Sequence, residues 1–470
     1  MPSVVRITEV SQMSLIKYIY SELLIRVFTF SSKNRLPWLA ALLFPAYMRR
    51  IKKAGKGGKP VRLLIIAKEG FNEDILASLG RDNRFVVFEL YRKVVKALAA
   101  GLLDPSLEDN NYVSKEIDVE ASKEAYRSFM KEFWQKLQLL YGFDAVLSGN
   151  FAYYADHEFA AALEELGVPF IVLQKENLKT PGFMGFFSYL YRERRGPFLG
   201  RKILVYNDIE RRLEIDSGVV SEEHVSVVGM PRLDRLHRMR QNGPPGEARR
   251  PAVLFFSFGP KTGLPLLARK AGSGILGNHE RLSSDWEMLN WERLCRECHM
   301  AMIRLARENP GIDVFIKSKM RDREKSAMHE MLGRDERLTP NVKIVIGGDP
   351  FQLIESSDVV CGFNTTALFE ALAAGRPVVV PLFEEALEST MTPYIVDMGE
   401  AVDYASSPNE LIRLLVSHAQ TPRKIATTLS DQKKKVLEKW VGNIDGRSGE
   451  RVRDAVIRII HQAESVKAAL

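Results

Sequence analysis

The sequence predicts an α/β protein with two Rossmann-like domains, and three observations lead to this prediction. Short β-branched apolar runs alternate with segments of helical periodicity, once from residue 61 onward and again from residue 252 onward. A stretch rich in glycine, proline and charge, residues 241–251, separates the two series as a linker would. The chain of 470 residues also exceeds what one hydrophobic core usually serves. Strands that alternate with helices form parallel sheets covered on both faces.

The predicted elements follow from these runs. In the first series, strands are expected at residues 61–67, 85–90, 143–147, 169–173, 202–206 and 225–228, and helices at 121–141 and 157–166. In the second series, strands are expected at 252–258, 314–318 and 342–346, and a long helix at 286–308. We therefore predict a first domain over residues 61–245, a second over 251–408 and charged helices over 409–470.

Residues 1–60 form a separate N-terminal extension. Residues 13–30 are apolar but include three charged side chains, which is typical of an amphipathic helix rather than a membrane span. Residues 36–48 are too few to cross about 30 Å of hydrocarbon. A basic cluster from Arg49 to Lys59 follows. The extension could bind an anionic membrane surface or pack on the first domain as a helical extension, and the sequence leaves both open. We find no secretory signal peptide in it.

Composition limits the partners and the compartment. A net charge of +8 and a pI near 9.2 fit an anionic partner, whether nucleotide, nucleic acid or membrane surface. Only three cysteines occur, Cys295, Cys298 and Cys361, which argues against a disulfide-built secreted fold. We therefore expect free thiols and a reducing compartment.

The most informative stretch is residues 358–381. An apolar run, a polar loop, a helical segment closed by Gly375 and a second β-branched run predict one βαβ unit. Its loop would place the three consecutive residues Asn364, Thr365 and Thr366 at a helix N-terminus, where free N–H groups attract phosphate. Glu370, one turn on, could accept hydrogen bonds from ribose hydroxyls. The alternative is an ordinary capped helix with a solvated Glu370.

Three lysines are predicted at the same edge of the second sheet. Lys317 and Lys319 lie at the carboxyl end of a predicted strand, and Lys261 follows the first strand of that domain. Together they suit a diphosphate, although each alone would be an ordinary surface lysine. The chain has no Walker loop and no Asp-x-Asp pair, so we expect neither a metal ion nor a cofactor.

In the first domain, residues 174–182 follow a predicted strand and offer the catalytic candidates. Glu176 is the candidate general base for an acceptor hydroxyl. His157 is the second candidate, and its alternative role is a helix residue satisfied by Asp156. Near the linker, Arg232 would either pair with Asp234 or contact the donor.

Two further segments match known sequence motifs, but their predicted secondary structure does not fit these motifs. Residues 272–277 fit the dinucleotide fingerprint Gly-x-Gly-x-x-Gly, but no strand precedes them and no apolar helix follows. We expect a glycine-rich loop there. The run Cys295-x-x-Cys298-His299 fits haem attachment but lies inside a predicted helix, and no second ligand pair completes a zinc site.

Taken in order, these motifs resemble the GT-B glycosyltransferase superfamily. The resemblance covers about residues 61–460 and rests on the unit at residues 362–370. Residues 228–234, Val-Gly-Met-Pro-Arg-Leu-Asp, and the tail at residues 443–451 are similar to its CDP-glycerol glycerophosphotransferase and capsule-polysaccharide branch. The resemblance implies two Rossmann-like domains facing a cleft and a nucleotide-activated donor. It also implies an acceptor in a bacterial surface polymer or glycolipid, and a peripheral position on the cytoplasmic face of the cell membrane.

The chain departs from that branch at two histidines. One would lie in the loop that here reads Gln174-Lys-Glu-Asn-Leu-Lys179, and the other where this chain has Lys317-Ser-Lys319. Their absence favours sugar transfer over glycerol-phosphate transfer. We therefore predict a metal-independent glycosyltransferase that uses a UDP-, GDP-, CMP- or CDP-linked donor and binds no nucleic acid. The alternatives are a CDP-glycerol glycerophosphotransferase, a nucleotide-sugar epimerase and a non-catalytic binding protein of the same fold.

Within this hypothesis each candidate residue has a role. Glu176 would act as the base, with His157 as its substitute, and Lys179 would position the acceptor. The remaining candidates, which would bind the donor, are Asn364, Thr365, Thr366, Glu370, Lys317, Lys319, Lys261 and Arg232.

Overall fold

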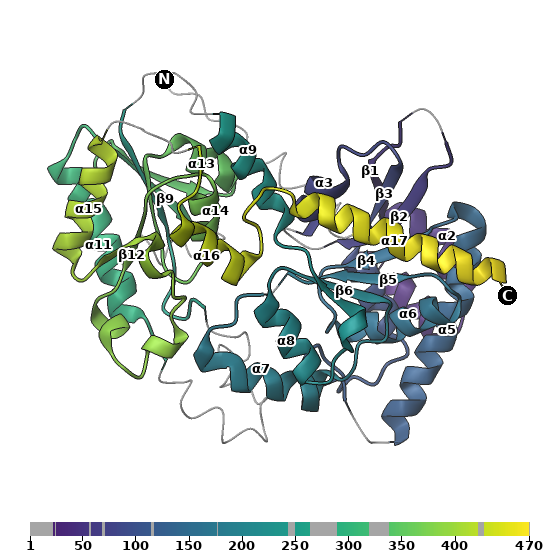
Figure 1. The fold of residues 1–470 in the computed structure, drawn as a ribbon. Helices are drawn as coiled ribbons and strands as arrows, with labels where there is room; N and C mark the ends of the chain where they lie inside the picture. The colour runs from purple at the N-terminus through teal and green to yellow at the C-terminus, as the bar shows by residue number, and fades with distance from the viewer. Residues whose placement is uncertain are drawn as a thin grey trace, which may run out of the picture. The chain divides into compact units, whose positions relative to one another are not determined.

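The structure is a computed structural model. It describes residues 22–23, 25–55, 58–67, 71–113, 117–175, 177–242, 250–263, 289–318, 338–421 and 427–469. The chain divides into two compact units (Figure 1). Unit 1 comprises Met1–Asn177, Ser188–Val228 and Gly449–Leu470, and unit 2 comprises Leu178–Phe187 and Gly229–Ser448. The chain therefore passes from one unit to the other four times.

Unit 1 contains a seven-stranded sheet in the order β1-β3-β2-β4-β5-β6-β7. The strands are β1 (Met48–Lys52), β2 (Val61–Ala67), β3 (Phe85–Tyr91), β4 (Ala145–Ser148), β5 (Phe170–Leu173), β6 (Lys202–Val205) and β7 (Val225–Val227). All neighbours are parallel except β1, which pairs antiparallel with β3. Strands β4 and β5 are buried along their whole length, as expected for continuous apolar runs in the centre of a parallel sheet.

The helices of unit 1 cover this sheet. They are the helical stretch 25–33, α2 (Pro37–Leu43), α3 (Phe71–Leu79), α4 (Arg92–Ala100), α5 (Ile117–Tyr141), α6 (Tyr154–Glu165), α8 (Asp208–Asp216) and α17 (Ser448–Ala469), whose first residue groups with unit 2. Helix α5 is the longest of these and packs against both α2 and α6 (Figure 1). Its buried face includes Phe129, Phe133 and Trp134. The described part of the N-terminal extension thus packs on unit 1, and its basic run begins as the edge strand β1.

Unit 2 contains a six-stranded, fully parallel sheet in the order β10-β9-β8-β11-β12-β13. The strands are β8 (Ala252–Phe256), β9 (Asp313–Ser318), β10 (Val342–Ile346), β11 (Val359–Cys361), β12 (Val378–Pro381) and β13 (Asp403–Ala405). The helices are α9 (Asp234–Asn242), α11 (Glu292–Glu308), α13 (Pro350–Ser356), α14 (Ala367–Ala373), α15 (Pro408–Gln420) and α16 (Asp431–Val441), while α7 (Met184–Leu190) is shared between the units. The predicted βαβ unit is confirmed as β11, α14 and β12.

Both units therefore confirm the predicted fold class of two Rossmann-like α/β domains with parallel sheets. Among the helices of the described residues, none is both long and apolar enough to cross a membrane. Within the same residues, no cluster of His, Cys, Asp and Glu side chains could hold a metal ion.

Candidate functional site

The sheet of unit 2 reverses its direction of growth between β8 and β11. From β8 the chain proceeds outward to β9 and β10, and it then returns to place β11, β12 and β13 on the other side. In open parallel sheets, ligands bind beside the carboxyl ends of the strands at such a switch point. The loops after β8 and β11, residues 257–263 and 362–366, are therefore the expected position of a site.

Asn364 connects these loops to a third segment. Its backbone is left-handed, with φ of 46°, a conformation that asparagine tolerates better than most residues. Its side-chain amide donates to the carbonyl of Tyr394 at 3.1 Å and accepts from the N–H of Val396 at 2.9 Å. A Cβ on Gly263 would lie 3.1 Å from the Asn364 side chain, so the two loops pack closely. The side chain of Asn364 thus holds residues 394–396, while the anion-binding role predicted for its backbone amide stays a prediction.

The two threonines lie where the sequence placed them, immediately before α14. Thr366 is the N-cap residue of this helix, and its side chain makes no capping hydrogen bond. The Thr365 hydroxyl accepts a hydrogen bond of 3.4 Å from the N–H of Ala367. Because Thr366 does not cap the helix with its side chain, its hydroxyl can serve a ligand.

Glu370 is buried and forms an ion pair with Arg232. The Arg232 Nε lies 3.4 Å from Glu370 Oε1, and the two side chains are 12% and 7% exposed. The alternative of a solvated Glu370 is therefore wrong. The structure brings together two candidates that lie 138 residues apart in the sequence. An acidic and a basic group held next to each other in a shielded position suit a ligand with hydroxyl and phosphate groups.

The motif around Arg232 is fixed by the tail motif. Asp234 accepts hydrogen bonds from the Asn443 side chain at 2.7 Å and from the Ser448 N–H at 3.1 Å. The Asn443 amide also donates to the carbonyl of Met230 at 2.8 Å. The motif at residues 228–234 and the tail at residues 443–451 therefore contact each other directly, and no sequence pattern indicates this contact.

The structure describes two of the three candidate lysines, Lys317 and Lys261, and their surroundings differ. Lys317 is buried at the end of β9, where it lies in register with Phe256 of β8, and its ammonium donates to the Ser318 carbonyl at 3.3 Å. Lys261 donates to the carbonyl of Leu289 at 2.7 Å. Lys319 lies outside the described residues, as does the glycine loop at 272–277. A buried lysine beside the switch point is not an ordinary surface lysine.

Lys179 belongs to a segment that sequence reasoning assigned to the first domain. Residues Leu178–Phe187 group with unit 2. There the Phe183 ring lies 4.6 Å from that of Tyr394, and a Cβ on Gly182 would come within 2.6 Å of the Tyr394 ring. Lys179 is buried with its ammonium 4.3 Å from the Phe187 ring centre. Gly182 and Tyr394 were missed as candidates, because nothing in the sequence indicates that these two segments meet.

In unit 1, the residues around the candidate base are held firmly. Glu176 itself lies outside the described residues. On one side, the buried Gln174 accepts from the Phe151 N–H and donates to Glu210 at 3.5 Å. On the other, Asn177 accepts from the Tyr206 N–H at 3.0 Å. The two residues that flank Glu176 in the sequence at positions 174 and 177 are thus anchored, and the role of Glu176 stays a prediction.

His157 is buried in α6. Its ring stacks on that of Tyr112 with 4.2 Å between centres, and its Nε2 has no hydrogen-bond partner among the described residues. Burial, aided by the positive charges of Lys123 and Arg195, lowers the pKa of His157 to about 3. Asp156 bonds to the Ser148 hydroxyl at 2.8 Å rather than satisfying His157. His157 is therefore neutral at pH 7 and shielded from solvent.

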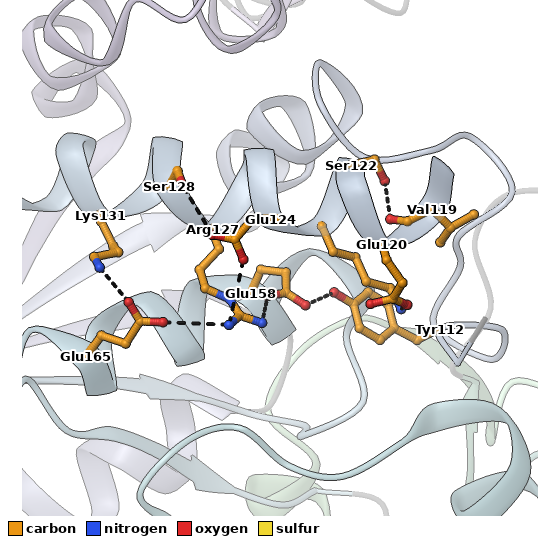
Figure 2. Close-up of polar contacts among 11 residues, drawn as sticks. Tyr112, Val119, Glu120, Ser122, Glu124, Arg127, Ser128, Lys131, Glu158 and Glu165 are labelled. Atoms are coloured by element: carbon orange, nitrogen blue, oxygen red, sulfur yellow. Dashed lines mark hydrogen bonds and ion pairs between the residues drawn. The ribbon is translucent and has the colours of Figure 1, made fainter. Parts of the chain in front are cut away.

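Next to His157, a network of ion pairs and hydrogen bonds connects α5 to α6 (Figure 2). The Tyr112 hydroxyl donates to Glu158 at 2.6 Å, and Arg127 pairs with the same carboxylate at 2.6 Å. Arg127 also lies 3.6 Å from Glu165, which Lys131 contacts at 2.5 Å. Tyr112 contacts Glu158 of α6 and Lys123 of α5, so its ring is held in place against His157. This favours a structural role for His157 over general base catalysis.

Asp156 should make stability depend on pH. Burial raises its pKa to about 6, so the folded chain holds a proton between about pH 4 and pH 6 that the unfolded chain has lost. The contribution of this group to stability therefore falls as pH rises through that window. We expect Asp156→Asn to gain about 2 to 3 kcal/mol over the wild type between pH 4 and pH 7.5, as measured by urea unfolding. His157 titrates in both proteins and cancels in the difference. A constant difference across this range would contradict the prediction.

The run from Cys295 to His299 carries no ligand geometry. All three cysteines are buried free thiols, which confirms that prediction. His299 uses both ring nitrogens, one toward the Ser257 hydroxyl at 2.9 Å and the other toward the Cys295 carbonyl at 2.7 Å. The histidine is thus satisfied as a core residue.

Comparison with known proteins gives structural matches only. No family model matches the sequence, and no curated protein matches it. The structure is similar to the UDP-GlcNAc 2-epimerase from Methanocaldococcus jannaschii, with a TM-score of 0.48 and 13% identity over 85% of this chain and 99% of that one. It is also similar to the UDP-GlcNAc 2-epimerase from Neisseria meningitidis bound to UDP-GlcNAc, with a TM-score of 0.47 and 12% identity over 84% and 99%. A third similar structure is Acinetobacter baumannii MurG, with a TM-score of 0.40 and 13% identity over 85% and 100%.

Proposed function

We propose that this protein is a nucleotide-sugar-dependent enzyme, and specifically a glycosyltransferase, whose donor binds at the switch point of unit 2. The observation that carries the proposal is the shielded Arg232–Glu370 ion pair, whose carboxylate lies on α14 one turn after Thr366. The buried Lys317 lies on the strand next to β8. Cationic groups, the threonine hydroxyls before α14 and one carboxylate then occupy the same edge of one sheet, and together they suit the phosphates and the ribose of a nucleoside diphosphate.

In this proposal the donor's diphosphate lies against Thr365 and Thr366, with Lys317 and Lys261 supplying positive charge. Glu370 accepts hydrogen bonds from the ribose hydroxyls, and Arg232 holds the carboxylate in place. When the acceptor hydroxyl attacks the anomeric carbon, the bond from that carbon to the diphosphate oxygen breaks. The negative charge that develops on the diphosphate is stabilised by groups already in place.

The proton of the acceptor hydroxyl goes to Glu176 of unit 1. A carboxylate is a competent base for this step, and Gln174 and Asn177, which lie on either side of Glu176 in the sequence, are each held by hydrogen bonds. His157 is the weaker candidate, because a neutral, buried and stacked imidazole cannot reach an acceptor without a rearrangement of Tyr112.

Thermal unfolding with nucleotides tests the proposal. A ligand that binds only the folded state raises the melting temperature. UDP-, GDP-, CMP- and CDP-linked donors should therefore be compared, with the free nucleosides as controls. A shift with one nucleotide sugar supports the donor site. If the nucleotide is released only when an acceptor is present, the reaction is a transfer. If the sugar of the nucleotide sugar is epimerised in the absence of an acceptor, the protein is an epimerase. If no donor shifts the melting temperature, the protein is a non-catalytic member of the fold.

Glu370→Ala should weaken donor binding by about 5- to 150-fold, because hydrogen bonds worth about 1 to 3 kcal/mol are lost in a buried position. Calorimetric titration with the donor identified above measures this change. Glu355→Ala is the matched control, because it removes a carboxylate from a more exposed ion pair with Arg235 in the same unit. Unchanged donor affinity in the Glu370 variant would remove this residue from the site.

A further inference from the structure

Helix α2 of unit 1 presents two large apolar side chains outward. Helix α2 buries only small residues, Pro37, Ala40 and Ala41, on the side that packs against α5. Trp38 and Leu42, one turn apart and therefore on one face, are 55% and 67% exposed. A helix that only covered a core would bury its largest side chains and expose its smallest. The outward face of α2 is therefore built for contact with something else.

The preceding helical stretch, residues 25–33, buries Phe28 completely and also exposes a large apolar side chain. Phe30 is 56% exposed, and the exposed Arg26 and Lys33 lie on the same face at helical spacing. A tight turn joins this stretch to α2, in which the Ser31 hydroxyl donates to the Leu36 carbonyl at 2.6 Å. Large apolar side chains and basic side chains are thus mixed over two consecutive helices.

The charge around this face has one sign. Residues 23–59 contain nine lysines and arginines and no aspartate or glutamate. Lys33, Arg35, Arg50 and Lys53 are exposed. The acidic residue that precedes this range, Glu22, is paired with Lys93 at 3.2 Å and does not offset them. Only Arg49 in this segment forms an ion pair, with Glu89 at 2.6 Å, among the residues that the structure describes.

We infer that the outward face of α2, defined by Trp38 and Leu42 and bordered by Lys33 and Arg35, docks on an anionic lipid surface. Exposed tryptophan and leucine insert at the boundary between headgroups and acyl chains, while lysine and arginine bind the headgroups. The charge argues against a second copy of this chain as the occupant, because two such basic faces would repel each other. The inference concerns unit 1 alone and does not depend on the donor site.

Vesicle sedimentation of the full chain tests this inference. The vesicles are phosphatidylcholine alone, or phosphatidylcholine with about one-third phosphatidylglycerol, at low salt and at about 0.5 M salt. We expect binding to the anionic vesicles only, weakened by salt. The double variant Trp38→Ser/Leu42→Ser should reduce binding to the anionic vesicles at least about tenfold. In the double variant Lys33→Gln/Arg35→Gln, each removed charge should reduce that binding about fivefold.

The controls separate docking from misfolding and from self-association. Leu387→Ser removes an equally exposed leucine, 61% exposed, from unit 2 and should leave binding unchanged. Melting temperatures should match among all variants. Fluorescence should show a lipid-dependent blue shift in the wild type that is missing in Trp38→Phe. The inference is overturned if the Trp38/Leu42 variant binds vesicles like the wild type, if uncharged vesicles bind equally, or if the wild type is a dimer without lipid that this variant dissociates.

Discussion

Replacing Gly229 by alanine should destabilise unit 2 by more than about 4 kcal/mol, enough to unfold it near physiological temperature. Gly229 has φ of +78°, which alanine adopts only with strain. A Cβ at this position would also lie 2.3 Å from the Ser448 hydroxyl and 2.5 Å from the Gly442 carbonyl. One of these neighbours is backbone and cannot rotate away, so the contact between the motif at residues 228–234 and the tail at residues 443–451 would have to open.

The control is Gly347→Ala in the same unit. Gly347 also has a left-handed backbone, with φ of +71°, but a Cβ there would have no atom of the described residues within 4 Å beyond its own chain neighbours. This variant should lose only the backbone strain, about 1 kcal/mol. Urea unfolding of both variants measures the difference. Equal losses would show that the Asn443 and Asp234 contacts do not depend on close packing at Gly229.

Glu176→Gln should reduce turnover by roughly a hundred- to ten-thousand-fold while donor affinity stays nearly unchanged. Glutamine keeps the size and much of the hydrogen bonding of the side chain but cannot accept a proton. Donor affinity should hold because the proposed donor contacts all lie in unit 2, whereas Glu176 follows β5 of unit 1. Initial rates and calorimetry with the same preparation give both quantities.

A matched pair of variants distinguishes the two candidate bases. His157→Gln keeps a buried polar side chain and should lower stability more than turnover, since it removes the stack with Tyr112. Retained activity in Glu176→Gln together with its loss in folded His157→Gln would reverse the assignment. Full activity in both variants would mean that the proton leaves by another route.

The strands were predictable because their apolar runs are continuous and bounded by turns, as in β2 and the pair β11 and β12. Strand β1 was not, because Met48–Lys52 is mostly basic and has no apolar alternation. Such composition is typical of an edge strand, whose exposed side is protected by charge. Strand β13 is as short as β11, but it begins with an exposed aspartate and contains no continuous apolar run.

The candidate site was predictable only in its local parts. The loop before α14 and the lysine at the end of β9 follow from local pattern and from the rule that parallel strands share a carboxyl edge. The pairing of Glu370 with Arg232 could not be predicted in this way, because the two residues meet only through tertiary packing. The same holds for Tyr394, which joins Asn364 to the segment around Gly182 through contacts that no periodicity encodes.

The four chain passages between the units have a consequence for dividing the protein. A single cut in the glycine- and proline-rich stretch at residues 241–251 yields two fragments, and neither fragment is one of the compact units. The C-terminal fragment would carry α17 away from the sheet on which unit 1 folds, and the N-terminal fragment would keep Leu178–Phe187 without Tyr394. The halves are therefore not independent modules, and a separately expressed donor unit would need a circularly rearranged chain rather than a truncated one.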